Sequence, residues 1–264
     1  MNARTSHKTR AIVLHTLDYG ESDRIATFYT REYGKLKGIA KGARRSRRRF
    51  ANALEPFSFT QVIFSRRGSG DTLAMVDQCE IIDHFPVIRS DLEKCVAASY
   101  LVELTGAFTV EGKKNEAVFQ LLVDFLALME NGPFRTSLLS FFEIRLLGLA
   151  GYEPVLDRCT RCHASLEAGR AFIFSNTRGG LQCSRCEPVP GAVPALSLGT
   201  IRSLLHGRTL PVRNLSRLLL SPQADDESRR LLVSFIQHLL GRELKSWQVL
   251  RQLRQLGAMN INTC

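Results

Sequence analysis

The chain has 264 residues, and its 36 lysine and arginine side chains against 25 acidic ones give a formal net charge of +11. This length exceeds that of a usual single domain and favours two or three structural units, and a hydrophobic fraction of 44% supports a buried core. No apolar run approaches the ~18 residues of a membrane span, and residues 1–10 lead into no cleavage-site pattern, so we expect a cytoplasmic protein without a membrane partner.

The positive charge is concentrated near the N-terminus. Residues 1–80 hold fifteen basic and eight acidic side chains, a net of +7, whereas residues 81–264 hold twenty-one and seventeen, a net of +4. A basic balance of this size is typical of nucleic-acid-binding proteins, although membrane-surface and ribosomal proteins share it. The primary contact with a polyanion is therefore expected in the first third of the chain.

Residues 1–84 are expected to form a small closed β-barrel. Five short segments are rich in β-branched and aromatic residues, and turn residues such as Gly34 separate them. They are Arg10–Leu17, Arg24–Thr30, Lys35–Lys41, Phe57–Arg66 and Thr72–Ile82. Five strands in this length favour an OB-fold, the five-stranded barrel most often tied to oligonucleotides, although an SH3-like barrel fits nearly as well. With the helices that follow, the predicted class is α+β.

A helical domain is expected over residues 85–151 and 196–254. Ser90 and Glu93 have the spacing of a capping box, and apolar residues recur every four positions from Leu92 to Phe108. Pro133 suits the first turn of a later helix, and Ser221 suits an N-cap. The remaining predicted helices are Glu116–Glu130, Phe134–Ala150, Ser197–Leu205, one that follows Ser221, and Leu244–Leu253.

Four cysteines in the segment 152–195 have the spacing of a structural zinc site. Cys159 and Cys162 form one C-x-x-C pair, and Cys183 and Cys186 form another after twenty residues. A two-residue gap lets one tight turn direct both thiolates at one ion, and two such turns complete a tetrahedron. The sequence predicts one structural Zn²⁺ on a hairpin of Ala171–Ser175 and Leu181–Cys183. Two disulfides or four free thiols are the alternatives.

A dense basic run is the candidate DNA-binding element. It contains eight basic residues and no acidic one: Lys35, Lys37, Lys41, Arg44, Arg45, Arg47, Arg48 and Arg49. In a strand the three lysines share one face, and residues 44–49 are expected to form a flexible loop tip whose guanidinium groups contact phosphates. Tyr29, Tyr33 and Phe50 could stack on unpaired bases, or they could simply be core. The alternative for the run is a solvated charge cluster.

No catalytic residues are predicted. The chain lacks a phosphate-binding G-x-x-x-x-G-K-[ST] loop, an H-E-x-x-H pair and a G-x-S-x-G turn. Asp18, Glu21 and Asp23 could suggest a metal-dependent nuclease, but surface turn residues are the better interpretation. The motifs therefore favour a binding protein, and a zinc-ribbon nuclease or other nucleic-acid enzyme is the alternative.

The ordered segments together resemble the RecO family of bacterial repair proteins. The resemblance rests on Asp18-Tyr-Gly-Glu-Ser-Asp-Arg24, on Tyr33-Gly-Lys-Leu-Lys-Gly-Ile-Ala-Lys-Gly-Ala-Arg-Arg45 and on Leu54-Glu-Pro-Phe57. It continues through Phe142-Glu-Ile-Arg-Leu-Leu-Gly-Leu-Ala-Gly-Tyr-Glu-Pro154 into the first cysteine pair, and through Gly241-Arg-Glu-Leu-Lys-Ser246. It covers nearly the whole chain.

This resemblance implies a recombination mediator without enzymatic activity. The family's architecture implies an N-terminal OB-fold, a helical domain and a zinc insertion. The resemblance also implies that the chain binds single- and double-stranded DNA and anneals complementary strands. The partners that it implies are RecR, the acidic C-terminal tail of the single-stranded-DNA-binding protein and, indirectly, RecA. A nucleoid-associated protein of the bacterial cytoplasm is expected.

Overall fold

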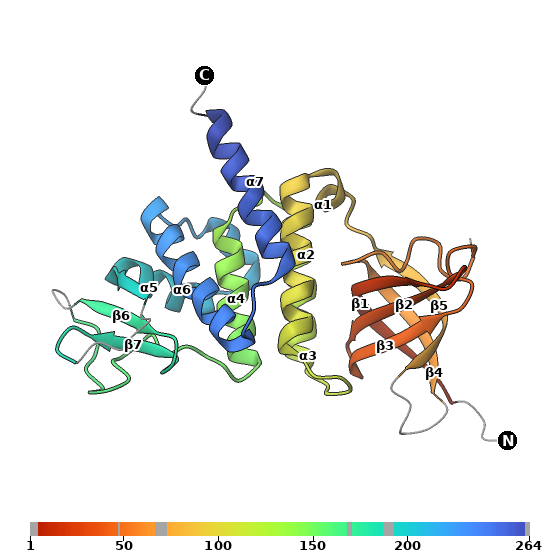
Figure 1. Cartoon of the computed structure of the whole chain (residues 1–264), viewed down its shortest axis with the longest axis horizontal. Helices are drawn as coiled ribbons and strands as arrows, with labels where there is room; N and C mark the ends of the chain where they lie inside the picture. The colour runs from red at the N-terminus through yellow and green to blue at the C-terminus, as the bar shows by residue number, and fades with distance from the viewer. Residues whose placement is uncertain (1–4, 47, 67–72, 168–170, 187–192, 262–264) are drawn as a thin grey trace. The chain divides into compact units, whose positions relative to one another are not determined.

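The computed structural model describes residues 5–46, 48–66, 73–167, 171–186 and 193–261 (Figure 1). They form two compact units. Residues 1–131 and 249–264 make up the first unit, and residues 132–248 make up the second. The mixture of strands and helices confirms the predicted α+β class, with an N-terminal sheet followed by helices and a cysteine cluster.

Five strands at the N-terminus close into a ring, which we call the N-terminal ring. They are β1 (Thr5–Tyr19), β2 (Asp23–Thr30), β3 (Gly34–Ala40), β4 (Phe59–Arg66) and β5 (Ala74–Asp83). The order is β1-β2-β3-β5-β4, and β1 closes the ring by pairing with β4. The contact between β3 and β5 is parallel and the other pairings are antiparallel.

All five predicted strands are present in the ring. The largest difference is at β1, which begins at Thr5 instead of Arg10 because Thr5 to Arg10 pair with β4. Thr72, the predicted first residue of the fifth strand, lies outside the described residues. Alternate side chains, among them Val13, Phe28 and Leu36, fill the interior of the ring and are almost completely buried.

Gly34 lets the chain turn tightly from β2 into β3. Its φ is +65°, in the left-handed region that favours glycine. A Cβ at this position would lie 2.2 Å from the carbonyl oxygen of Lys113, so backbone from the segment after α2 packs directly on the turn. The predicted turn is therefore also a contact between the ring and the helices of the first unit.

Three helices complete most of the first unit: α1 (Pro86–Ser90), α2 (Leu92–Phe108) and α3 (Glu116–Asn131). The predicted capping box at Ser90 is wrong, because the side chain of Asp91 accepts the hydrogen bond from the backbone N–H of Lys94. Ser90 instead donates to the carbonyl of Val87 within α1, a one-turn helix that the sequence analysis did not predict.

The second unit combines helices with a small sheet. Its helices are α4 (Ser137–Leu149), α5 (Leu198–Thr209), the 3₁₀ helix η1 (Val212–Arg217) and α6 (Pro222–Leu240); α7 (Lys245–Ile261) begins here and continues into the first unit. Its strands β6 (Phe172–Ser175), β7 (Gly180–Cys183) and β8 (Val193–Leu196) form a sheet in the order β7-β6-β8. None of the described helices is long and apolar enough to cross a membrane.

Helix ends in the second unit test the capping predictions. Ser221 is the predicted N-cap of α6, and its hydroxyl accepts from the backbone N–H of Ala224. The predicted start of α4 at Phe134 is wrong, since the helix begins at Ser137 and Pro133 precedes it by four residues. The predicted division into three parts at residues 84, 151 and 195 stays a prediction. The two compact units divide the chain at other positions, after residues 131 and 248.

Candidate metal centre and nucleic-acid interface

The chain around the first cysteine pair is hydrogen-bonded to the strand that ends at the second. The backbone N–H of Leu181 in β7 donates to the carbonyl of Val155 at 2.9 Å, and the N–H of Thr160 donates to the carbonyl of Leu181 at 2.7 Å. Cys159 therefore lies beside the end of β7, where Cys183 is its last residue. The predicted hairpin of β6 and β7 is confirmed and positions Cys183 and Cys186.

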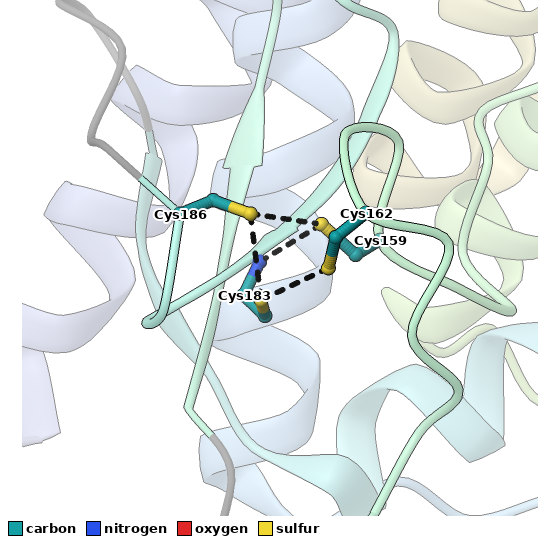
Figure 2. A group of neighbouring side chains, drawn as sticks. All are labelled: Cys159, Cys162, Cys183 and Cys186. Atoms are coloured by element: carbon teal, nitrogen blue, oxygen red, sulfur yellow. Dashed lines mark hydrogen bonds between the residues drawn. The ribbon is translucent and has the colours of Figure 1, made fainter.

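The four cysteine side chains converge on one point, as Figure 2 shows. All four Sγ atoms lie within 4.8 Å of one another. The closest pairs are Cys162–Cys183 at 3.6 Å, Cys183–Cys186 at 3.8 Å and Cys159–Cys186 at 3.9 Å. A tetrahedron with metal–sulfur bonds of ~2.3 Å has edges of about 3.8 Å, whereas a disulfide needs about 2.05 Å. The sulfur spacing fits one shared ion and excludes disulfides in this arrangement.

Backbone amides favour the thiolate form of Cys159, whereas burial and the neighbouring cysteines raise the pKa of Cys186 to about 12. The N–H of Cys183 donates to the sulfur of Cys159 at 3.4 Å, and the N–H of Arg161 donates to it at 3.5 Å. Burial raises the pKa of the Cys159 thiol, but the backbone hydrogen bonds from Cys162, Cys183 and Arg161 outweigh it and lower the pKa to about 6. Because metals bind thiolates, this environment prepares Cys159 as a ligand.

Four thiolates saturate a tetrahedral ion and leave no position for water or a substrate. Such a centre holds chain segments together and has no role in catalysis. Here it would join the turn at residues 159–162 to the end of the β6–β7 hairpin. The neighbouring His163 is exposed, and its backbone N–H donates to the carbonyl of Cys159.

Lys37, Lys41 and Arg48 are the predicted DNA-binding residues that extend freely from the N-terminal ring. All three are exposed, and within the described residues their side chains form no hydrogen bond or ion pair. Lys37 projects from β3, and the other two belong to the segment between β3 and β4. We call them the exposed cations. Arg47 lies outside the described residues.

Lys35 has a structural environment that its sequence neighbours lack. Its ammonium donates to the carbonyl oxygens of Gly106 at 2.8 Å and Thr109 at 2.5 Å, at the C-terminal end of α2. Positive charge at a helix C-terminus satisfies carbonyls that have no partner within the helix. Burial lowers the pKa of Lys35, the reverse of what an adjacent phosphate would do.

In the segment between β3 and β4, which we call the basic segment, Arg44 and Arg45 are held by acidic residues at the turn between β1 and β2. Arg44 lies 3.6 Å from the Asp18 carboxylate, and Arg45 lies 3.8 Å from that of Glu21. The backbone N–H of Arg44 also donates to the carbonyl of Ser22 at 3.0 Å. The segment is therefore fixed to that turn at Arg44, where the sequence predicted a flexible tip.

Arg49 lies near the end of the basic segment and is bound in place. Its guanidinium donates to the carbonyl of Lys41 at 2.8 Å and lies over the ring of Phe50. Phe50 is almost fully buried in the core of the N-terminal ring. Tyr29 is buried too, but its hydroxyl donates to the carbonyl of Asn115 outside the ring, and Tyr33 is half-buried. Neither Phe50 nor Tyr29 presents a free face on which a base could stack.

A pocket that the sequence analysis did not single out lies next to Arg44 and Arg45. Its volume is about 540 Å³, and Arg24, Asn52 and Glu55 contribute to its wall. Arg44, Arg45 and Phe50 line this pocket and had candidate roles in the sequence, but no motif indicated that they enclose a pocket with Asn52 and Glu55.

Two family descriptions together match almost the whole chain. "Recombination protein O N terminal" matches residues 1–85, and "Recombination protein O C terminal" matches residues 89–248. A protein of Syntrophus aciditrophicus (strain SB) named "DNA repair protein RecO" is 46% identical over 259 residues, which are 97% of this chain and 100% of that relative. Relatives of the same name are 36% identical in Anaeromyxobacter sp. (strain K), over 94% of this chain and 97% of the relative, and 37% identical in Geobacter metallireducens, over 94% and 98%.

Proposed function

The chain belongs to the RecO family of DNA repair proteins, and we propose that within this family it is a recombination mediator that binds single- and double-stranded DNA and anneals complementary strands. The observation that carries the proposal is the N-terminal ring with its exposed cations. Its strand order and parallel β3–β5 contact are those expected of an OB-fold, the barrel through which many proteins bind oligonucleotides.

Binding would be electrostatic and independent of sequence. Lys37, Lys41 and Arg48 are free to contact phosphates and release counterions. Arg44 and Arg45 can join them by exchanging surface carboxylates for phosphates, since their ion pairs are exposed and weak. Neutralising phosphates lowers the repulsion between two strands, so annealing can run on binding energy without a nucleotide cofactor.

The metal we propose for the cysteine centre is one structural Zn²⁺. The chemistry of the donor set supports it, because four thiolates in a tetrahedron are a set that zinc prefers. When bound, zinc would supply a cross-link between the two cysteine pairs. Cys159 would contribute a thiolate already stabilised by backbone N–H groups, and nothing in the centre would react.

The partners we propose are RecR, the acidic tail of the single-stranded-DNA-binding protein and, indirectly, RecA. Family membership supports these proposals, together with localisation to the bacterial nucleoid. Within the family the mediator's role would be to help RecA replace the single-strand binder on DNA. No step of that role requires a bond to be made or broken.

A strand-annealing assay tests the mediator function. Complementary labelled strands are mixed without ATP, bare or coated with the single-strand binder, in its intact form or lacking its tail. We expect rapid annealing of bare strands. We expect annealing of coated strands only when the single-strand binder on them retains its acidic tail. Failure to anneal bare strands at low salt would refute the mediator function. Equal annealing with the intact and tailless binder would refute the tail contact.

The alternative, a zinc-ribbon nuclease or other nucleic-acid enzyme, is tested by long incubation of labelled DNA with Mg²⁺ or Mn²⁺. The surface carboxylates at the β1–β2 turn are the residues such an enzyme would need, and Asp18 and Glu21 face arginines instead. We expect intact strands. Cleavage that Asp18→Asn abolishes would establish the enzyme.

A further inference from the structure

The pocket beside the basic segment has the size and composition of a small-molecule site. Its volume of about 540 Å³ lies within the range of ~300–1,000 Å³ that encloses small ligands. It is lined by the segment between β3 and β4 and by Arg24 of β2. All of its residues belong to the first unit, and none is a metal ligand.

The floor and the walls of the pocket differ in chemistry. Phe50 and Leu54 close its base from the core of the N-terminal ring, but they are almost fully buried and expose little apolar surface. The rim carries the guanidinium groups of Arg44 and Arg45. A mostly polar lining with a cationic rim suits a polar ligand that carries negative charge at one end.

One carboxylate restricts what can enter. Glu55 lines the pocket and is held in place by Arg24. The Arg24 guanidinium lies 2.9 Å from the Glu55 carboxylate and 3.1 Å from the Asp18 carboxylate. A bare phosphate reaching Glu55 would be repelled, whereas an N–H donor would be bound. A ligand therefore needs its anionic part at the rim and a donor at its other end.

Asn52 adds a second polar group that has no other use in the structure. It lines the pocket, its φ is +61°, and its side-chain amide forms no hydrogen bond to another described residue. An amide both donates and accepts, so it can pair with the edge of a nucleobase.

We propose that this pocket binds one unpaired nucleotide of single-stranded DNA, with the phosphate on Arg44 and Arg45 and the base edge on Asn52 and Glu55. The proposal rests on the proposed function, DNA binding, and adds a contact between the pocket and an unpaired nucleobase. Every nucleobase has N–H or carbonyl groups on its Watson–Crick edge, and in a duplex that edge is already paired. The site therefore distinguishes unpaired strands from duplex DNA without selecting a sequence.

The test compares two oligonucleotides of equal length, one intact and one with every base removed. Both carry the same phosphates, so the ratio of their dissociation constants isolates the base contact. A hydrogen bond to a charged acceptor predicts about tenfold tighter binding of the intact strand. In the double variant Asn52→Gly with Glu55→Ala this ratio should fall to about one. Glycine tolerates the positive φ, so the fold should persist, as thermal unfolding will show.

Asp18→Asn is the matched control. It also removes a carboxylate that pairs with Arg24, but Asp18 does not line the pocket. Both variants should strengthen binding of the strand without bases by removing negative charge, and only the double variant should lose the ratio. A wild-type ratio of one with a normal salt dependence would overturn the nucleotide site and leave DNA binding intact. A ratio that survives in the double variant, or is lost equally in Asp18→Asn, would also overturn it. No binding of either oligonucleotide would overturn the proposed function itself.

Discussion

The cysteine centre and the basic segment are both dense motifs, yet the structure treats their members differently. All four cysteines belong to one cluster, with sulfur atoms within 4.8 Å of one another. The basic residues have at least three environments. Lys35 binds the end of a helix, and Arg44 and Arg45 pair with acids. The exposed cations form no hydrogen bond or ion pair with the described residues, although the pKa of Asp23 is lowered by the Gly42 N–H and also by nearby Lys41. Metal ligation imposes one geometry on every ligand, while charge imposes none on a surface cation. Spacing therefore predicts a ligand set better than density predicts a contact set.

The largest effect should come from the cysteine centre. Structural zinc binding contributes on the order of 10 kcal/mol to local folding, so Cys159→Ser should remove the metal and unfold residues 155–167 and 171–186. Metal content should fall from one zinc per chain to well below one, and amide hydrogen exchange across β6 and β7 should lose its protection. DNA affinity should change far less than solubility.

Cys95→Ala is the control, because Cys95 is a free, half-buried thiol outside the cluster. It should retain one zinc per chain and normal protection of β6 and β7. Freshly prepared, unchelated wild-type protein that contains no zinc would remove the basis of the comparison, since the four cysteines would then form a cluster without sharing an ion.

The exposed cations should control DNA binding. Replacing Lys37, Lys41 and Arg48 with glutamine should shallow the log–log salt dependence of single-strand affinity by about 2, at about 0.7 for each phosphate contact. Near 0.1 M salt that corresponds to roughly hundredfold weaker binding, alike for all sequences. Titrations at four salt concentrations measure the slope. An unchanged slope would move the DNA contact away from these three residues.

Lys35 should behave as a structural residue although it is part of the same run. Lys35→Met leaves the carbonyls of Gly106 and Thr109 without their donor and should lower the free energy of unfolding by ~1–3 kcal/mol. The salt slope of DNA binding should not change. Lys37→Met, two positions along β3, is the control, and it should reduce the slope without lowering stability. If Lys35→Met and Lys37→Met reduced the salt slope of DNA binding equally, Lys35 would also be a DNA contact.

The strands were predictable from the sequence because turn residues and alternating apolar side chains mark both their ends and their buried face. The one-turn helix α1 was not, since five residues are too few to display a helical period. The same helix explains the wrong cap: Ser90 and Asp91 are both good N-cap residues, and α1 occupies Ser90. Which of two capable residues caps a helix depends on the path of the preceding chain.

The candidate sites show the same limit. The cysteine cluster could be predicted because its spacing encodes two turns that bring the four thiols together. The role of Lys35 could not, since its partners lie about seventy residues away and are backbone carbonyls of no particular residue type. Asn52 and Glu55 were also missed, because a pocket forms from the fold of the segment and has no spacing signature.

The smallest effect tests whether surface carboxylates limit DNA binding by competing with phosphates. Arg45 and Glu21 are separated by 3.8 Å, and both side chains are largely exposed, at 74% and 93%. Water and salt screen such a pair, so its loss should free Arg45 at little cost to the fold. Glu21→Gln should therefore tighten single-strand binding by less than about fivefold and leave the unfolding temperature unchanged. The gain should shrink as salt rises, because screening weakens the carboxylate's competition and the phosphate's attraction together. A gain well above fivefold would mean that the acids of the β1–β2 turn inhibit binding strongly. In that case Arg44 and Arg45 would rank with the exposed cations as the main phosphate contacts.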